Sequence, residues 1–318
     1  MMTPGRLLYL SWHLPKAKFL GCVRAGGPLE QWRTERGRKA MEQAAYRLPV
    51  TMPMPESPLE VHLLTGHRFW YQTAFCLWTL SSNANRRVSP SIWDDGSLLA
   101  KEREALLRLF PGARFVSRRE TLAHLDRHLP ASRFPVLRER WQHYPNIRKL
   151  IDIHAGSTGW KLVLDSDLLF FRRPSFLIDW LDQPRKPLHA VDCETSYGYS
   201  MGLLAELAGT APAECLNVGL CGLQSEKIDW DRLESWCHTL IDRSGTHYYL
   251  EQALVALLLA GKDCAIAPAE DYVTLPRPPE ALTCHAVMHH YVADSKKWYF
   301  RHNWKRAECA STNPFAAR

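Results

Sequence analysis

The sequence predicts an α/β fold built on a single Rossmann-like sheet, mixed but mainly parallel, with helices on both faces. Short apolar runs of strand length alternate with amphipathic stretches of helical length from residue 59 to residue 305. Strands that alternate with helices at this spacing are typical of a parallel sheet covered on both faces. The chain has 318 residues, of which 46% are hydrophobic, and this is enough to bury a large core.

Three segments of the chain differ in composition. Residues 1–58 are basic and irregular, and four prolines within 48–58 block both a helix and a central strand, so we expect an N-terminal arm or linker there. The alternating pattern defines a predicted domain over 59–305. Residues 306–318 are expected to form a C-terminal tail.

The first half of the domain predicts three strands and the helices between them. Each apolar run is followed by a helical pattern, and Pro111 with Gly112 stops the helix before the third strand. The expected strands are 61–66, 87–93 and 113–116, and the expected helices are 69–80 and 98–110. Residues 118–150 are basic and mostly helical between prolines, and Asn146 can cap a helix that runs to Asp152.

The second half continues the alternation after a central apolar run, 160–171. The expected strands after that run are 188–192, 216–222, 264–267 and 286–290. The expected helices are 174–181, 200–207, 230–241 and 248–260. In open α/β sheets ligands bind beyond the carboxyl ends of the strands, so polar residues at those ends are the first candidates for a site.

The charge and the cysteine content narrow the class of protein. The net charge of +7 favours anionic ligands without identifying one. The nine cysteines are odd in number and scattered, with no C-x-x-C pair, which indicates reduced thiols in a cytoplasmic protein. The sequence has no run of 18 apolar residues and no signal-peptide pattern. We therefore expect a cytoplasmic protein, whose basic N-terminal arm is a candidate for contact with the inner face of a membrane.

Asp165 and Asp167 interrupt the central apolar run. If this run is one strand, the two carboxylates project to the same face, because strand side chains alternate. Two buried, unpaired carboxylates repel each other and lose their hydration, and a divalent cation would relieve both costs. A strand-end turn or a helix cap is the structural alternative for the same residues.

Two further polar clusters follow expected strands. Thr65 and Gly66 end the first strand, and residues 94–97, which include Asp95, end the second. A turn followed by a helix cap explains the composition of 94–97. A nucleotide-contacting role is compatible with such a turn and would add to it.

Together these motifs resemble glycosyltransferases that use nucleotide sugars and have the GT-A fold. The resemblance is greatest to the retaining glycosyltransferase family eight, which includes glycogenin and the bacterial lipopolysaccharide galactosyltransferases. The family's C-terminal motif is His-x-x-Gly-x-x-Lys-Pro-Trp. It is matched here at His290, Lys296 and Trp298, whereas Ala293 and Lys297 stand at the glycine and proline positions.

Two internal motifs extend the resemblance. The family's Asn-x-Gly segment is matched by Asn217 and Gly219, and its Asp-Gln pair is matched by Glu251 and Gln252. Asp192 ends an expected strand where the family also carries an acidic residue. The resemblance covers the predicted domain motif by motif and does not include the N-terminal arm.

The resemblance implies roles for individual residues. Its metal ligands would be Asp165, Asp167 and His290, a set that suits Mn2+ and, less well, Mg2+, which prefers oxygen and water. The other implied roles are nucleoside or phosphate contacts at Thr65, Gly66, Asp95 and Lys296, sugar or acceptor contacts at Asn217 and Glu251, and catalytic groups at Gln252 and Asp192.

The implied activity is a metal-dependent, hexosyltransferase-type transfer from a nucleotide sugar, with UDP as the expected nucleotide. The acceptor would be a hydroxyl of a saccharide, a lipid-linked molecule or a protein, and the resemblance implies retention at the anomeric carbon. An inverting GT-A transferase shares the aspartates but needs a general base. A sugar-phosphate nucleotidyltransferase is a further alternative, but that class usually carries a Gly-rich loop after its first strand. The corresponding residues of this chain, 64–70, contain one glycine.

A non-catalytic protein that binds a nucleotide or a nucleic acid is the alternative from a different class. Nucleic-acid binding would require a strong basic patch with interleaved aromatic residues. The aromatic residues here are scattered and the charge is moderate. We therefore expect no nucleic-acid partner.

Overall fold

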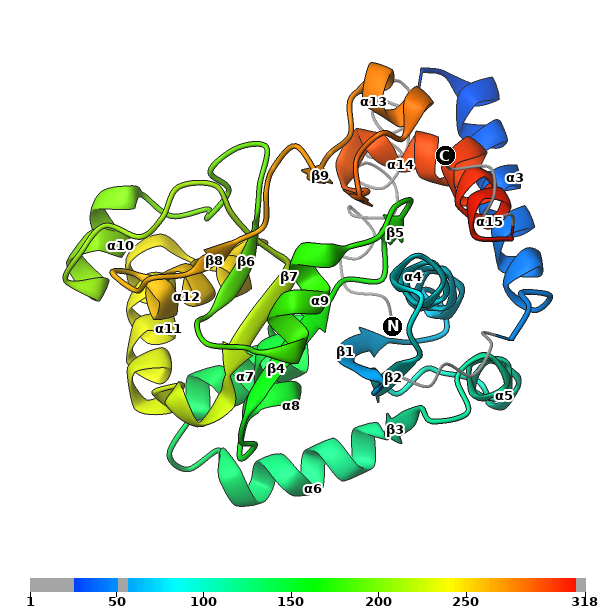
Figure 1. Cartoon of the computed structure of the whole chain (residues 1–318). Helices are drawn as coiled ribbons and strands as arrows, with labels where there is room; N and C mark the ends of the chain where they lie inside the picture. The colour runs from blue at the N-terminus through cyan, green and yellow to red at the C-terminus, as the bar shows by residue number, and fades with distance from the viewer. Residues whose placement is uncertain (1–25, 51–56, 313–318) are drawn as a thin grey trace, which may run out of the picture.

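A seven-stranded sheet forms the centre of the molecule, with helices on both of its faces (Figure 1). The structure is a computed structural model that describes residues 26–50 and 57–312. Across the sheet the strands are β3 (Arg114–Val116), β2 (Val88–Asp94), β1 (Leu59–Thr65), β4 (Trp160–Leu164), β7 (Leu216–Gln224), β6 (Leu188–Val191) and β8 (Ala265–Ile266).

The directions of the strands confirm the predicted mixed, mainly parallel sheet. Strand β7 runs antiparallel to both of its neighbours, β4 and β6, and the other neighbouring pairs in this sheet are parallel. Because β1, β2 and β4 run in the same direction, their carboxyl ends meet at one edge of the sheet. The polar clusters that follow these three strands therefore lie at the same edge.

The expected helices are confirmed, with shifts of a few residues at their ends. Before β4 the helices are α3 (Pro28–Ala45), α4 (Trp70–Ala84), α5 (Ala100–Leu109), α6 (Arg118–His128), α7 (Pro135–His143) and α8 (Arg148–His154). After β4 they are α9 (Ser175–Asp182), α10 (Met201–Ala208), α11 (Trp230–Ser244) and α12 (Leu250–Leu259). Three further helices, α13 (Pro278–Thr283), α14 (Lys296–Trp298) and α15 (Trp304–Thr312), were not among the expected ones. The buried faces of the helices form two large apolar clusters with the sheet, one that includes α4 and one that includes α12.

The central apolar run, 160–171, is two strands rather than one. Its second part, β5 (Leu168–Phe170), belongs to a three-stranded sheet with β10 (Met288–His290) and β9 (Tyr272–Thr274). Asp165 and Asp167 lie in the connection between the two sheets. The expectation that strand alternation places both carboxylates on one face is therefore wrong. The apolar residues on either side of the aspartates pack in different sheets, which local periodicity does not reveal.

Residues 28–45 form helix α3, where the sequence predicted an irregular arm. Met41 and Ala45 are buried in the apolar cluster that includes α4. Arg301 donates from Nε to Thr34 Oγ1 at 2.8 Å and forms an ion pair with Glu30. The helix contacts α4 and residues 299–303, which directly precede α15 (Figure 1). Its apolar stripe is short and its polar partners come from the far end of the chain, so no local pattern indicated it.

The rest of the arm and the tail is described in part. Residues 1–25, 51–56 and 313–318 lie outside the described residues, and with them much of the Pro-rich segment and the stretch considered for membrane contact. The expected boundary between 305 and 306 falls within α15. Within the described ranges, every helix is too short or too polar to cross a bilayer.

Candidate active site

The connection after β4 and the end of β10 bring three possible metal ligands together. One ligand atom from each of Asp165, Asp167 and His290 lies within 4.8 Å of the other two. Asp165 N donates to Gly219 O at 2.8 Å, and Tyr291 N donates to Asp167 O at 3.0 Å. These backbone bonds to β7 and to the residue after β10 hold the connection in place. The three predicted metal ligands are therefore adjacent.

The imidazole of His290 is oriented by its Nδ1 atom. Nδ1 lies 3.1 Å from Asn217 Oδ1, an acceptor that also receives a hydrogen bond from Gly219 N. In the neutral ring this bond places the proton on Nδ1 and leaves the lone pair on Nε2. Nε2 is buried and has no hydrogen-bond partner among the described residues. It lies 3.3 Å from Asp167 Oδ1 and 3.6 Å from Asp165 Oδ2, an arrangement that fits a divalent cation.

Two lysines flank the carboxylates. Lys296 Nζ lies 2.8 Å from Asp167 Oδ2, and Lys149 Nζ lies 2.7 Å from Asp165 Oδ1. Burial alone would raise the pKa of Asp167, but Lys296 and His290 outweigh it and hold that pKa well below its ordinary value. Burial lowers the pKa of His290, and the neighbouring carboxylate of Asp167 outweighs this effect and raises it. Asp167 is thus ionised, as a metal ligand must be.

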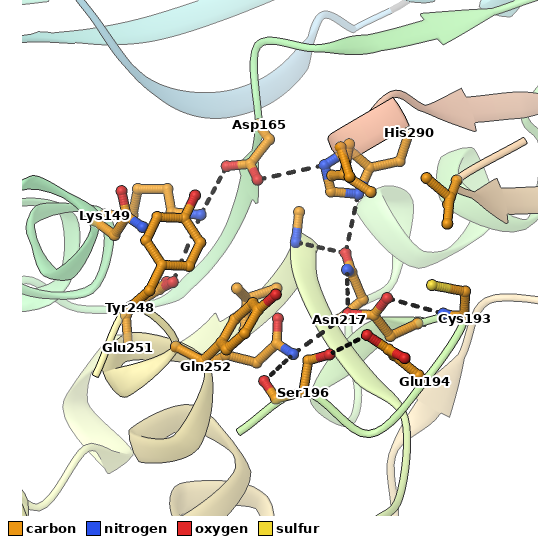
Figure 2. Close-up of a pocket in the computed structure, with 18 of the residues that line it drawn as sticks. Lys149, Asp165, Cys193, Glu194, Ser196, Asn217, Tyr248, Glu251, Gln252 and His290 are labelled. Atoms are coloured by element: carbon orange, nitrogen blue, oxygen red, sulfur yellow. Dashed lines mark hydrogen bonds and ion pairs between the residues drawn. The ribbon is translucent and has the colours of Figure 1, made fainter. Parts of the chain in front are cut away.

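Lys149 links the three ligands to a neighbouring pocket (Figure 2). Its Nζ lies 3.6 Å from Glu251 Oε2 as well as beside Asp165. Burial disfavours the charge on Lys149, but the two carboxylates outweigh burial and raise its pKa. Burial also raises the pKa of Glu251 to about 7, although Lys149 partly offsets it. Glu251 therefore changes its charge near neutral pH.

Asp192, Asn217 and Gln252 form a hydrogen-bonded group beside His290. Asn217 Nδ2 and Gln252 Nε2 donate to Asp192 Oδ2 at 3.0 and 3.3 Å. Gln252 Nε2 also donates to Ser196 O at 2.9 Å. Asn217 thus contacts the proposed metal ligand with its oxygen and the carboxylate with its nitrogen. The predicted sugar-side and catalytic residues are brought together in this way.

These groups line a pocket of about 380 Å³. Of the predicted site residues, Asp165, Asp192, Asn217, Glu251, Gln252 and His290 are among its lining residues. Tyr248 and Tyr249 also line the pocket, and Tyr248 is 69% exposed. Figure 2 shows the Tyr248 ring between Lys149 and Gln252. Convergent polar groups with aromatic rings beside them are typical of pockets for small polar ligands.

Thr65, Gly66 and Asp95 lie together at the ends of β1 and β2 but are not among the lining residues of this pocket. Asp95 N donates to Thr65 O at 2.9 Å, and a Cβ on Gly66 would overlap the Asp95 carboxylate. The Thr65 hydroxyl is buried and accepts from Thr73 Oγ1 at 2.8 Å. Asp95 Oδ1 accepts from Ser97 N at 2.9 Å, which confirms the turn predicted there. The side chain of Thr65 is therefore engaged within the fold.

Several residues of the pocket were not predicted from the sequence. Lys149 is the second residue of α8, and it reaches Asp165 because this helix packs beside β4. Tyr144 hydrogen-bonds through its hydroxyl to Tyr248 O, which joins the loop before α12 to α7. One sequence signal could have indicated them. A histidine and two tyrosines, residues 247–249, lie two to four positions before the predicted Glu251.

Comparisons with known proteins identify the fold. No family model matches the chain, and no curated protein sequence matches it. Mouse xyloside xylosyltransferase 1, in its apo form, is similar over 74% of this chain and 99% of that chain, with 13% sequence identity and a TM-score of 0.50. The galactosyltransferase LgtC, in complex with donor and acceptor sugar analogs, matches 80% of this chain and 95% of its own, with 13% identity and a TM-score of 0.49.

The xylosyltransferase likeness, together with the sheet topology, confirms the predicted GT-A glycosyltransferase fold. At this level of identity it shows the fold alone. The function must therefore be argued from the residues of the site.

Proposed function

We propose that this protein is a metal-dependent glycosyltransferase that moves a sugar from a nucleotide sugar to a hydroxyl acceptor, with UDP as the nucleotide. The observation that carries the proposal is the convergence of Asp165, Asp167 and His290 beside Lys296. Two of these residues, Asp165 and His290, also line the polar pocket. The sequence predicted the four residues from two distant motifs, residues 165–167 and residues 290–298, and the adjacency of the two motifs in the fold supports the proposal.

A divalent cation fits this set of ligands. Two carboxylates and one imidazole suit Mn2+, and suit Mg2+ less well. The buried Nε2 of His290, which has no hydrogen-bond partner among the described residues, provides the imidazole ligand. A metal bound there would act as a Lewis acid on the diphosphate of the donor.

The two lysines would contribute charge from opposite sides of the site. Lys296 has a side chain that is 36% exposed, so it can contact a diphosphate while it remains near Asp167. Lys149 is 13% exposed and bound between Asp165 and Glu251, so its role would be to orient the Asp165 carboxylate. Phosphate contact by Lys296 and orientation by Lys149 are both electrostatic roles that need no proton transfer.

Asp192 and Gln252 are the proposed catalytic residues of a retaining transfer. Asn217 and Gln252 fix the Asp192 carboxylate beside the pocket, where it can stabilise positive charge that develops on the sugar. Asn217 and Glu251 are proposed to contact the sugar or the acceptor. In a retaining reaction without a protein nucleophile, the departing diphosphate can accept the proton of the incoming hydroxyl. An inverting reaction would instead need a base such as Asp192 or Glu251.

The proposed function also includes a nucleoside contact, a class of acceptor and a cellular location. Gly66 and Asp95, at the sheet edge beside the aspartates, are proposed to contact the nucleoside, with the backbone rather than the side chain of Thr65. The acceptor is proposed to be a saccharide, a lipid-linked molecule or a protein. The scattered cysteines support a cytoplasmic location, and the basic residues 1–25 support a contact with the inner face of the membrane.

Thermal unfolding of the full chain with a panel of nucleoside diphosphates, with and without Mn2+, tests the proposal. A ligand that binds only the folded state raises its stability, by about 2.7 kcal/mol when present at a hundred times its dissociation constant. We expect UDP to raise the melting temperature only in the presence of Mn2+. If no nucleotide raises it with Mn2+ present, the proposed function is wrong. The anomeric configuration of the product, measured by proton NMR, separates retention from inversion.

A further inference from the structure

On strands β3, β2, β1 and β4, the face of the sheet that is covered by α6 and α8 carries only a small apolar cluster. It consists of Trp93, Val116, Ile153 and Val163, with Leu64 packed against it. The opposite face of the same strands contributes to the large cluster that includes α4. The small cluster fills the part of this face that lies toward the carboxyl ends of the strands. The part of this face that lies toward the amino ends of the same strands is outside the cluster.

A polar residue stands two positions before the apolar residue on each of the four strands β3, β2, β1 and β4. These residues are Arg114, Ser91, His62 and Lys161. Strand alternation places each of them on the same face as the apolar residue that follows. The register pairs Ser91 with both Arg114 and His62. On β4 it pairs His62 with Val163, so Lys161 lies two residues before the position opposite His62. The sheet thus presents a row of four polar side chains to the space under α6.

This row lines a cavity of about 220 Å³ that is separate from the candidate active site. Thr121 and His124 of α6 and Ser157, in the loop before β4, line it from the other side. The cavity lies earlier along β1 and β4 than Thr65 and Asp165, which end these strands at the active-site edge. Its lining therefore combines two fixed cations with hydroxyl groups and imidazoles.

The two cations of the cavity have no partner of their own. The Arg114 guanidinium and the Lys161 ammonium form no hydrogen bond or ion pair with any residue in the described ranges. Glu120 also lines the cavity, but its carboxylate accepts from Ser117 N and Oγ at 2.7 and 2.6 Å, at the start of α6. Glu60, beside Lys161 in the sheet, attracts it only at longer range. The positive charge in the cavity is therefore not neutralised by a contact within the described chain.

His62 is prepared to donate a hydrogen bond into this environment. Burial, with the nearby charges of Lys161 and Arg114, lowers the pKa of His62 to about 3, so the ring is neutral at physiological pH. Trp93 Nε1 donates toward His62 Nδ1 at 3.5 Å. A neutral ring that accepts at Nδ1 carries its proton on Nε2, which leaves an N–H donor. The cavity lining thus offers donors and positive charge, which together select an anion.

We propose that this cavity binds a small anion of the phosphate class, either inorganic phosphate or a phosphate monoester. Arg114 and Lys161 would supply charge-assisted hydrogen bonds, and Ser91 and the neutral His62 would add uncharged donors. The cavity is a poor site for a metal cation, because the one carboxylate in its lining is hydrogen-bonded at the start of α6. An apolar ligand is equally unsuited, because the row contributed by the four strands is polar. The proposal does not depend on the function proposed above.

Thermal unfolding of the full chain in inorganic phosphate, compared with chloride at the same ionic strength, tests the proposal. We expect phosphate to raise the melting temperature of the wild type. In the double variant Arg114→Gln, Lys161→Gln the apparent dissociation constant should rise by about a hundredfold, at roughly tenfold for each charge-assisted hydrogen bond lost. Lys296→Gln serves as the control, because it removes the other phosphate candidate and should leave this response in place.

Three outcomes would overturn the proposal: no rise in the wild type, an equal rise in the double variant, or a rise that Lys296→Gln alone abolishes. If the double variant does not fold, Arg114→Gln alone decides, because Arg114 is exposed and its replacement leaves the core intact. It should weaken phosphate binding by about tenfold. Glycerol phosphate in place of inorganic phosphate then distinguishes the two sources, since a site for monoesters would bind it more tightly.

Discussion

Gly219 of β7 lies against the imidazole ring of His290, so closely that no side chain fits between them. A Cβ on Gly219 would lie 2.6 Å from His290 Nδ1 and 2.9 Å from Asn217 Oδ1. The close approach of His290 therefore explains why a glycine occupies position 219 of the Asn-x-Gly segment. Its absent side chain lets the ring approach Asn217 and point Nε2 at the two aspartates.

Gly219→Ala is expected to displace His290 and to weaken Mn2+ binding by about 10- to 100-fold, as does the loss of a hydrogen bond that orients a metal ligand. The measurement is the Mn2+ concentration that gives half of the nucleotide-dependent thermal shift. Gly202→Ala on α10 is a matched control, because a Cβ there meets nothing within 4 Å. Equal Mn2+ affinity in both variants would show that the close contact does not position the histidine.

Asp167→Asn should abolish the Mn2+-dependent stabilisation by UDP, and Asp165→Asn should weaken it strongly. Each change replaces a charged ligand by a neutral amide, so we expect a loss of more than about 100-fold in metal affinity, which is more than the loss of a group that only orients a ligand causes. Isothermal titration with Mn2+ measures the affinity directly. Asp242→Asn, on the exposed end of α11, is the control and should bind Mn2+ as the wild type does. An unchanged affinity in Asp167→Asn would rule out this residue as a ligand.

Lys149→Met is expected to lower stability without metal and to recover part of the loss when Mn2+ is added. The substitution leaves Asp165 and the buried Glu251 without their shared cation, and breaking a buried ion pair costs on the order of 3 kcal/mol. Chemical unfolding with and without Mn2+ measures both effects. The exposed Lys101→Met should change stability little. The idea that Lys149 balances charge at the metal site fails if Mn2+ restores no more stability to Lys149→Met than to that control.

Asp152 of α8 predicts a pH dependence of stability that is separate from the active site. It is buried and accepts a hydrogen bond from Trp141 Nε1 at 2.5 Å, and burial raises its pKa to about 7. The folded state therefore keeps the proton in a range where the unfolded state has lost it. Stability should fall as the pH rises from about 4 to 7, by at most about 1.4 kcal/mol per pH unit from this group.

Asp152→Asn should flatten this part of the profile, because the amide still accepts from Trp141 and does not titrate. At a pH above 7 the variant should be more stable than the wild type. Urea unfolding at several pH values, with Asp242→Asn as the control, measures the slope. A slope that remains the same in Asp152→Asn would assign the pH dependence to other groups.

Ala293→Gly should stabilise the protein. Ala293 has a φ angle of 43°, a left-handed conformation that favours glycine, and it stands at the glycine position of the C-terminal motif. Removing the strained Cβ should gain about 1 kcal/mol. Ala205→Gly, in the interior of α10, is the matched control and should cost about 1 kcal/mol. A loss of stability in both variants would mean that the Ala293 backbone is not strained.

The fold class, most of the helices and strands, and the aspartate pair could be predicted from the sequence. Helices and strands follow from the spacing of apolar residues within short windows, which is a local property. Asp165 and Asp167 were recognised because carboxylates within an apolar run are a local feature, and His290 was implied by the resemblance of its His-Lys-Trp spacing to a family motif. The strand ends expected at one edge of the sheet do meet there.

Contacts between residues of distant segments could not be predicted and are visible in the folded chain alone. The apolar run around the aspartates is divided between two sheets, because its halves pair with β7 and with β10. Lys149 joins the site because α8 packs beside β4, and α3 joins the fold because Arg301 and Glu30 meet. These pairings depend on packing across the whole chain, and no spacing within a segment records them.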